Sequence, residues 1–217
     1  MNGKFLNRID AGRQLAELLE GYQGHENMVV LGLPRGGVPV AYEIAEKLKA
    51  PLDIYIVRKL GTPGQEELAM GAVASDGAFV LNTDVLRSVG ISQSAVDRVK
   101  ERELAEIRRR EEEYRGGRQR VSLQGKKVLL VDDGLATGAT MKAAVQAVRS
   151  SKPEKVIVAV GTTPPQTFNE LQARDDIDEV VAVLKPSIFM GVGGSYEDFS
   201  QTTDDEVRDC LFKKRDE

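Results

Sequence analysis

The chain has 217 residues, 41% of them hydrophobic and 29% charged, with a formal net charge of −4 at pH 7. This composition is typical of one well-packed globular domain, and the charge offers no general surface for nucleic acid or membranes. One cysteine and one histidine exclude an internal disulfide framework and multi-histidine metal sites, and no apolar run has the length of a signal peptide core or membrane span, so we expect a cytoplasmic protein.

The first third of the chain alternates helical and strand patterns. Leucines on one face predict a first helix, and two short apolar runs flank a second helical pattern. The expected elements are a helix over 8–22, a strand over 28–33, a helix over 38–48 and a strand over 52–57.

Residues 61–71 are predicted to form a polar loop bearing Gly and Pro, long enough to carry function. Two short strands are expected within 71–81, around a turn at 75–77. A long, charged helix follows over 92–114. Its basic run at 108–110 is followed at once by three glutamates, so we interpret it as a solvated helix with a thin apolar stripe.

The second half of the chain repeats the alternation of strand and helix. Strands are expected over 127–131, 155–160 and 179–184, with helices over 140–150, 166–173 and 204–212. Such alternation predicts an α/β fold in which helices flank a parallel, Rossmann-like sheet.

Residues 128–140, Val-Leu-Leu-Val-Asp-Asp-Gly-Leu-Ala-Thr-Gly-Ala-Thr, are the most informative segment. Asp132 and Asp133 stand where a buried strand is expected to end, and a Gly/Thr loop leads into a helix. Free N–H groups at a helix N-terminus can hold a phosphate, and carboxylates can accept hydrogen bonds from a vicinal diol. The plainer alternative is an Asp pair that caps the helix. The sequence contains neither a P-loop nor a dinucleotide fingerprint.

This segment resembles the 13-residue signature of type I phosphoribosyltransferases, which bind 5-phosphoribosyl-1-pyrophosphate (PRPP). The resemblance implies that Asp132 and Asp133 hold the ribose hydroxyls and contact Mg²⁺. It also implies that a loop holds the 5′-phosphate, formed by Ala136, Thr137, Gly138, Ala139 and Thr140. Over roughly residues 29–199 the chain is similar to bacterial phosphoribosyltransferase-domain proteins.

Two further segments are expected at the same edge of the sheet, because ligands of such folds bind at the carboxyl ends of strands. Arg35, Gly36 and Gly37 follow the first strand and resemble the family's pyrophosphate loop, although such a sequence can also be a simple turn. Arg58 and Lys59 follow the second predicted strand and resemble a catalytic cation pair of the adenine-type enzymes; the alternative is a pair of exposed basic residues.

The resemblance also bears on the acceptor. Enzymes for 6-oxopurines carry an Asp before the Thr-Gly of the signature, where this chain has Ala136. The signature sequence is therefore closer to that of adenine and uracil enzymes. In adenine enzymes a Glu of the closing loop moves the proton, which implies Glu66 as general acid/base here.

The segment after residue 184 resembles the hood in which the family binds its base. Phe189, Tyr196 and Phe199 can stack on a heterocycle there, or can simply pack the hood onto the core. We therefore expect a phosphoribosyltransferase core over 1–184, with the long helix inserted at about 92–117, and a small C-terminal hood and helix over 185–217.

The predicted function is Mg²⁺-dependent transfer of the 5-phosphoribosyl group from PRPP to a nitrogenous base, with release of pyrophosphate. The alternative is a non-catalytic PRPP- or nucleotide-binding regulator with the same fold. The resemblance further implies a homodimer whose partners are PRPP and a nucleobase-like acceptor, with no nucleic acid and no membrane.

Overall fold

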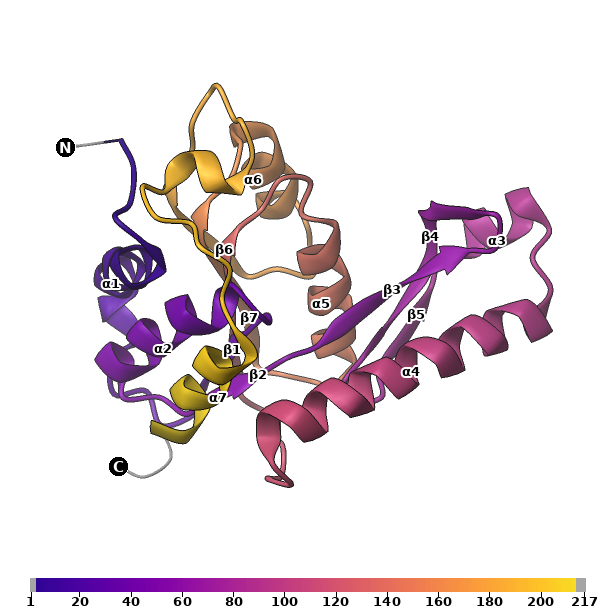
Figure 1. Ribbon diagram of the computed structural model, residues 1–217, viewed down its shortest axis with the longest axis horizontal. Helices are drawn as coiled ribbons and strands as arrows, with labels where there is room; N and C mark the ends of the chain where they lie inside the picture. The colour runs from indigo at the N-terminus through magenta and orange to yellow at the C-terminus, as the bar shows by residue number, and fades with distance from the viewer. Residues whose placement is uncertain (1–2, 214–217) are drawn as a thin grey trace.

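Five parallel strands form the central sheet of the computed structural model, which describes residues 3–213 apart from the Glu67 side chain (Figure 1). Every neighbouring pair in this sheet is parallel. In spatial order the strands are β2 (Leu52–Ile54), β1 (Met28–Gly32), β6 (Lys127–Gly134), β7 (Lys155–Thr162) and β8 (Glu179–Leu184). The predicted α/β class with a parallel sheet is confirmed.

Both faces of this sheet are covered, which explains why its strands are continuous apolar runs. Successive side chains of a strand point to opposite faces. In β6, Leu129 and Val131 pack into the cluster that includes α1 and α2, whereas Val128 and Leu130 pack into the cluster that includes α5. The helices of this part are α1 (Arg8–Leu18), α2 (Gly37–Leu48), α5 (Ala139–Ser150), α6 (Pro165–Gln172) and α7 (Asp204–Lys213).

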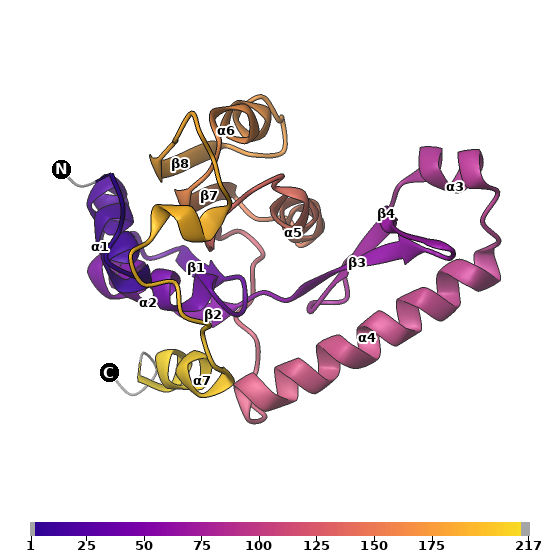
Figure 2. The same ribbon diagram turned by 45° about the horizontal axis from the view of Figure 1, so that its top comes forward.

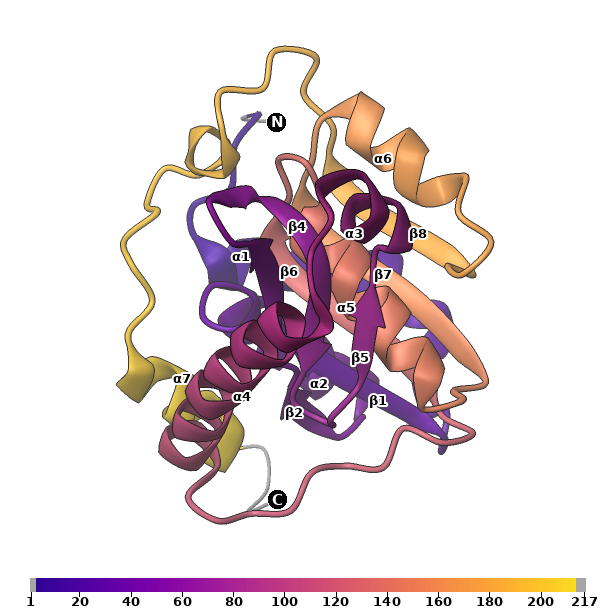
Figure 3. The same cartoon turned by 90° about the vertical axis from the view of Figure 1, so that its right-hand side faces the viewer.

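A second, antiparallel sheet projects from the core as an arm (Figure 2). It packs against α4 and α5, and Figure 3 shows these two helices on opposite sides of the arm. The elements of the arm are β3 (Val57–Thr62), β4 (Gln65–Ala74), β5 (Phe79–Leu81), α3 (Thr83–Val89) and α4 (Gln93–Arg115).

The prediction of a loop over residues 61–71 is wrong, because this segment forms most of a β-hairpin. Thr62 pairs with Gln65 across a two-residue turn, Pro63-Gly64, in which Gly64 has φ 81°. Proline followed by a glycine with positive φ is the sequence preference of a tight type II turn. Leu60 and Met70 are fully buried, and this packing stabilises strands of low β-propensity.

The strand predicted over residues 52–57 is divided between the two sheets. β2 ends at Ile54, and Val57 begins β3 of the arm. The first predicted helix also divides, since α1 ends at Leu18 and a 3₁₀ turn covers Glu20–Tyr22. Helix α3, capped by the Asn82 side chain, was not predicted from the sequence.

The segment after β8 crosses back over the core without a further strand, through a 3₁₀ turn at Val192–Ser195, and ends in α7. Residues 214–217 of the predicted C-terminal region lie outside the described part. Within residues 3–213, no helix combines the length and apolar character needed to cross a membrane.

Candidate functional site

Asp132 and Asp133 immediately precede the last residue of β6, at the carboxyl edge of the sheet. Asp132 Oδ1 accepts the backbone N–H of Asp133 at 2.9 Å, and Asp133 Oδ2 accepts Arg8 Nε at 2.8 Å. Removal from water and the neighbouring Asp133 carboxylate together raise the pKa of Asp132 well above its ordinary value. Two carboxylates are thus held side by side, one of them already neutralised by an arginine.

The loop after β1 lies directly against this acid pair. An added Cβ would stand 2.1 Å from Asp133 Oδ2 at Gly36, and 2.5 Å from the Val131 carbonyl oxygen at Gly37. Such distances are impossible for a real side chain, so the two glycines permit the close approach. The predicted pyrophosphate loop and the acid pair therefore adjoin one another. The peptide bond between Pro34 and Arg35 in this loop is cis.

Residues 136–140 form the turn that leads from β6 into the first residues of α5. Gly138, the N-cap residue of α5, takes a left-handed conformation with φ 70° and has no side chain to cap the helix. The Thr137 hydroxyl accepts the Ala139 N–H in a long hydrogen bond of 3.4 Å. Ala136, Thr137 and Thr140 are exposed. Thr167 of α6 stabilises the turn, since its hydroxyl donates to the Ala136 carbonyl at 2.6 Å. A helix N-terminus at an exposed turn is suited to bind an anion.

The two cations predicted after the second strand lie on opposite faces of the arm. Because they are neighbours in β3, their side chains leave opposite faces of the arm. Arg58 binds Glu103 of α4 at 2.8 Å, whereas Lys59 and Ala139 line a cavity of about 380 Å³ between the arm and α5. Only Lys59 thus faces the N-terminal turn of α5. The pair lies in the arm and not at the end of a central strand, because β2 ends at Ile54 and Arg58 and Lys59 belong to β3.

Arg35 is directed toward the C-terminal elements, with its guanidinium 3.8 Å from Asp204 at the start of α7. Asp204 also accepts the Tyr114 hydroxyl at 2.7 Å, and burial together with this acceptor raises the pKa of Tyr114 to about 12. The Arg35 side chain is therefore joined to the start of α7 by an ion pair at the limit of contact.

Glu66 is not brought to the acid pair. It is exposed and follows the turn that joins β3 to β4, which Figure 1 shows at the outer end of the arm. The sequence placed it in a closing loop; the structure places it in a hairpin that extends away from the core.

The three hood aromatics have different surroundings. Tyr196 is 3% exposed and its hydroxyl donates to the Asp133 carbonyl at 2.6 Å, so it packs the hood onto the core and offers no face to a base. Phe199 is 37% exposed, with the Arg8 guanidinium 4.0 Å from its ring centre. Phe189 is half-buried. For Tyr196 the packing alternative is the correct one.

Arg8 is the contact residue that the sequence did not indicate. It is the first residue of α1, where a positive charge opposes the helix dipole. This position was the sequence signal that could have indicated Arg8, because a positive charge at a helix N-terminus needs a negative or polar partner from outside its own helix. Asp133 and the Ser200 carbonyl, which accepts Arg8 Nη1 at 2.6 Å, supply it.

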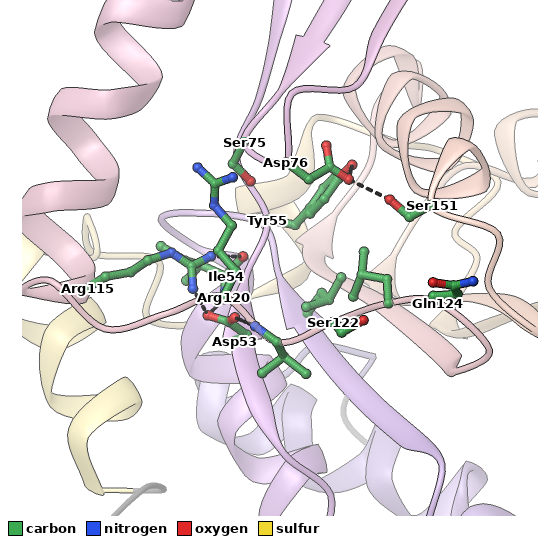
Figure 4. A pocket seen from close by; sticks show the side chains of 13 residues that line it. Asp53, Ile54, Tyr55, Ser75, Asp76, Arg115, Arg120, Ser122, Gln124 and Ser151 are labelled. Atoms are coloured by element: carbon green, nitrogen blue, oxygen red, sulfur yellow. Dashed lines mark hydrogen bonds and ion pairs between the residues drawn. The ribbon is translucent and has the colours of Figure 1, made fainter.

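A second cavity, of about 330 Å³, lies at the base of the arm (Figure 4). It contains none of the residues predicted for the site. Its polar groups bind one another: Asp76 accepts the hydroxyls of Tyr55 and Ser151, and Asp53 accepts Arg115. This cavity therefore marks the junction of arm and core rather than the site at the sheet edge.

We expect Asp132→Asn to raise the free energy of unfolding at pH 8 by about 1 kcal/mol, a usual gain for a stabilising substitution. A carboxyl whose pKa is raised by folding resists ionisation there, so its charge opposes folding above that pKa. The advantage of the variant should shrink as the pH falls and both states become protonated. Urea unfolding without divalent cations, at several pH values, checks this; an advantage that grows toward low pH would contradict it.

The comparisons with known proteins agree with this geometry. The family model described as phosphoribosyl transferase domain matches residues 4–186. A Mycobacterium tuberculosis protein provisionally named as a phosphoribosyl transferase is 50% identical over 203 residues, or 94% of this chain. The chain spans 45% of that relative's length.

Two other similarities differ in extent. The Enterococcus faecalis protein named bifunctional protein pyrR is 30% identical over 145 residues, covering 66% of this chain and 61% of that protein. The crystal structure of TT1426 from Thermus thermophilus is 44% identical with a TM-score of 0.86, covering 97% of this chain and 98% of that one.

Proposed function

The chain belongs to the phosphoribosyl transferase domain family, and we propose that it transfers the 5-phosphoribosyl group of PRPP to a nitrogenous base and releases pyrophosphate. Its parallel sheet flanked by helices is the type I phosphoribosyltransferase fold. The family supports phosphoribosyl transfer in general. PRPP as donor, Mg²⁺ dependence and the acceptor class are our proposals.

One observation carries the proposal. The glycine loop after β1, the acid pair of β6 and the exposed N-terminal turn of α5 lie in succession along one edge of the sheet. A pyrophosphate, a ribose diol and a 5′-phosphate also follow one another within a single PRPP molecule. The three segments of the protein thus follow the same order as the three groups of PRPP that they would bind.

Each segment then has a role that its chemistry supports. The N–H groups at the start of α5 would bind the 5′-phosphate. Asp132 and Asp133 would accept hydrogen bonds from the ribose hydroxyls, and Gly36 would present its N–H group to the pyrophosphate. The Gly37 N–H donates to the Leu33 carbonyl at 3.0 Å, so Gly37 would contribute by letting the backbone approach closely. Lys59, on the face of the arm toward α5, would add positive charge. The reaction passes through a ribooxocarbenium-like state, so placement of charge supplies most of the catalysis.

The residues present fit a magnesium ion that is shared with the donor. Among residues 3–213, no cluster of three or more His, Cys, Asp or Glu side chains is arranged to hold a metal. Asp132 and Asp133 would contribute oxygens and the donor the others, as is usual for Mg²⁺ bound with phosphates. When bound, the ion would neutralise charge on the leaving pyrophosphate.

The acceptor would enter from the hood. Phe189 and Phe199 remain the candidates to contact the base, and Ala136 in place of an acid favours a base of the adenine or uracil type over a 6-oxopurine. We also propose that the protein forms a homodimer and is cytoplasmic.

A screen for pyrophosphate release tests the proposed reaction. The purified protein is incubated with PRPP, Mg²⁺ and one base at a time, and each reaction is repeated with Asp132→Asn/Asp133→Asn. We expect release with at least one base and none with the double variant. Equal release by both proteins would contradict the assigned site.

A regulator that binds PRPP without turnover is the second candidate, because Glu66 follows the β3–β4 turn, which lies at the outer end of the arm (Figure 1). The same screen separates the two functions. PRPP binding with no pyrophosphate release from any base would favour the regulator, whereas release identifies the transferase.

Our mechanism has no step through Glu66, so Glu66→Gln should leave the turnover number within about twofold of the wild-type value. A general acid or base usually contributes about 10²- to 10⁴-fold to a rate. The measurement is steady-state pyrophosphate release with the base found in the screen. A hundredfold loss would show that the arm closes during turnover and would restore the catalytic role implied by the family resemblance.

A further inference from the structure

Arg8 connects three parts of the chain that are distant in sequence. Its Nε donates to Asp133 Oδ2 at 2.8 Å, and its Nη1 donates to the Ser200 carbonyl at 2.6 Å. Its guanidinium carbon lies 4.0 Å from the centre of the Phe199 ring. Helix α1, the acid pair and the hood therefore meet at one side chain.

This contact is largely shielded from solvent. The side chains of Arg8 and Asp133 are 13% and 12% exposed. The glycine loop closes the remaining side, since a Cβ at Gly36 would stand 3.1 Å from Arg8 Nε. A charged hydrogen bond in such surroundings is stronger and more directional than an exposed one.

The geometry also orients the carboxylate of Asp133. Arg8 binds Oδ2, so the hydrogen bond restrains the position of this group beside Asp132. Arginine suits this task because its planar fork can bind the carboxylate and the Ser200 carbonyl together while its flat face lies on Phe199.

We propose that Arg8 is a positioning residue of the donor site: it fixes the Asp133 carboxylate for a ribose hydroxyl and ties the hood to it. This inference rests on the proposed function. It predicts that Arg8 affects PRPP binding through Asp133 and not through the stability of α1.

The test is calorimetric titration of PRPP with Mg²⁺ into the wild-type protein, Arg8→Gln, Arg8→Lys and the control Arg13→Gln. We expect Arg8→Gln to raise the dissociation constant about ten- to hundredfold, as is usual for residues that orient a ligand-binding group. Arg8→Lys keeps a charge beside Asp133 but loses the planar fork, so its affinity should fall between those of the wild-type protein and Arg8→Gln.

Arg13 is a matched control because it lies on the same helix, is 69% exposed and binds Glu43 instead of the acid pair. Its variant should bind PRPP within twofold of the wild-type protein. Thermal unfolding of each variant shows whether it is folded at the titration temperature.

Two failures can be told apart. If the wild-type protein binds PRPP and Arg8→Gln binds it equally well, or Arg8→Lys binds as weakly as Arg8→Gln, the role of Arg8 is wrong and the proposed function stands. If the folded wild-type protein does not bind PRPP, the proposed function fails, and this inference fails with it.

Discussion

Replacing Gly36 with alanine is expected to weaken PRPP binding about a hundredfold while leaving the fold intact. The backbone of Gly36 has φ −61° and ψ −30°, which alanine adopts freely. The added Cβ, however, would stand 2.1 Å from Asp133 Oδ2 and 2.8 Å from its Cγ. The carboxylate must therefore turn away from Arg8 and from the ribose. Losing one buried, charged hydrogen-bond partner costs about 2–5 kcal/mol, which is about thirtyfold or more in affinity.

Titration of PRPP with Mg²⁺ into the folded variant measures this effect. Gly21→Ala is the matched control, because a Cβ at Gly21 meets no atom within 4 Å. It should bind PRPP as the wild-type protein does. An unchanged affinity in Gly36→Ala would show that the position of Asp133 does not govern donor binding.

Arg115→Gln is expected to lower the free energy of unfolding by about 3–5 kcal/mol, the usual cost of removing one partner from a buried ion pair. Arg115 and Asp53 have side chains 7% and 2% exposed, and their closest atoms are 2.5 Å apart. Arg115 also donates to Glu111 at 3.2 Å and to the Ile54 carbonyl at 2.9 Å. The substitution would leave charge buried at the junction of arm and core.

Arg109→Gln provides the comparison on the same helix. Arg109 is 61% exposed and pairs with Glu106 at 2.9 Å. Exposed pairs of this kind contribute about 0.2–1 kcal/mol, so this variant should lose far less stability. Urea unfolding of both variants at pH 7 measures the two free energies. Equal losses would mean that the buried network does not hold α4 to the core.

The sheet and the positions of the loops at its carboxyl edge were predictable from local patterns. The run before Asp132 is apolar because both faces of β6 are covered, and its end is marked by two acids and a glycine. The stripe of Val96, Val99 and Ile107 likewise predicted the buried face of α4, and all three are buried. Each of these signals lies within a few residues of the element it specifies.

The arm was not predictable in the same way. Residues 65–74 carry few strand-forming side chains, and their extended shape depends on packing against helices that follow later in the chain. Glu111 and Arg115 belong to the helix that was predicted to be solvated, but both side chains are less than 10% exposed. Their burial follows from Asp53, which is distant in sequence. Arg8 escaped prediction for the same reason, since its partners are Asp133 and Ser200.

Calorimetric titration of PRPP with Mg²⁺ into the wild-type protein and into Asp132→Asn/Asp133→Asn tests the donor site most directly. Each of the two substitutions keeps the size of the side chain and removes its charge, so the fold of the double variant should persist. Circular dichroism checks this. We predict saturable binding by the wild-type protein and none by the double variant. No binding by the folded wild-type protein, or equal binding by both, would contradict the assignment of PRPP to this edge of the sheet.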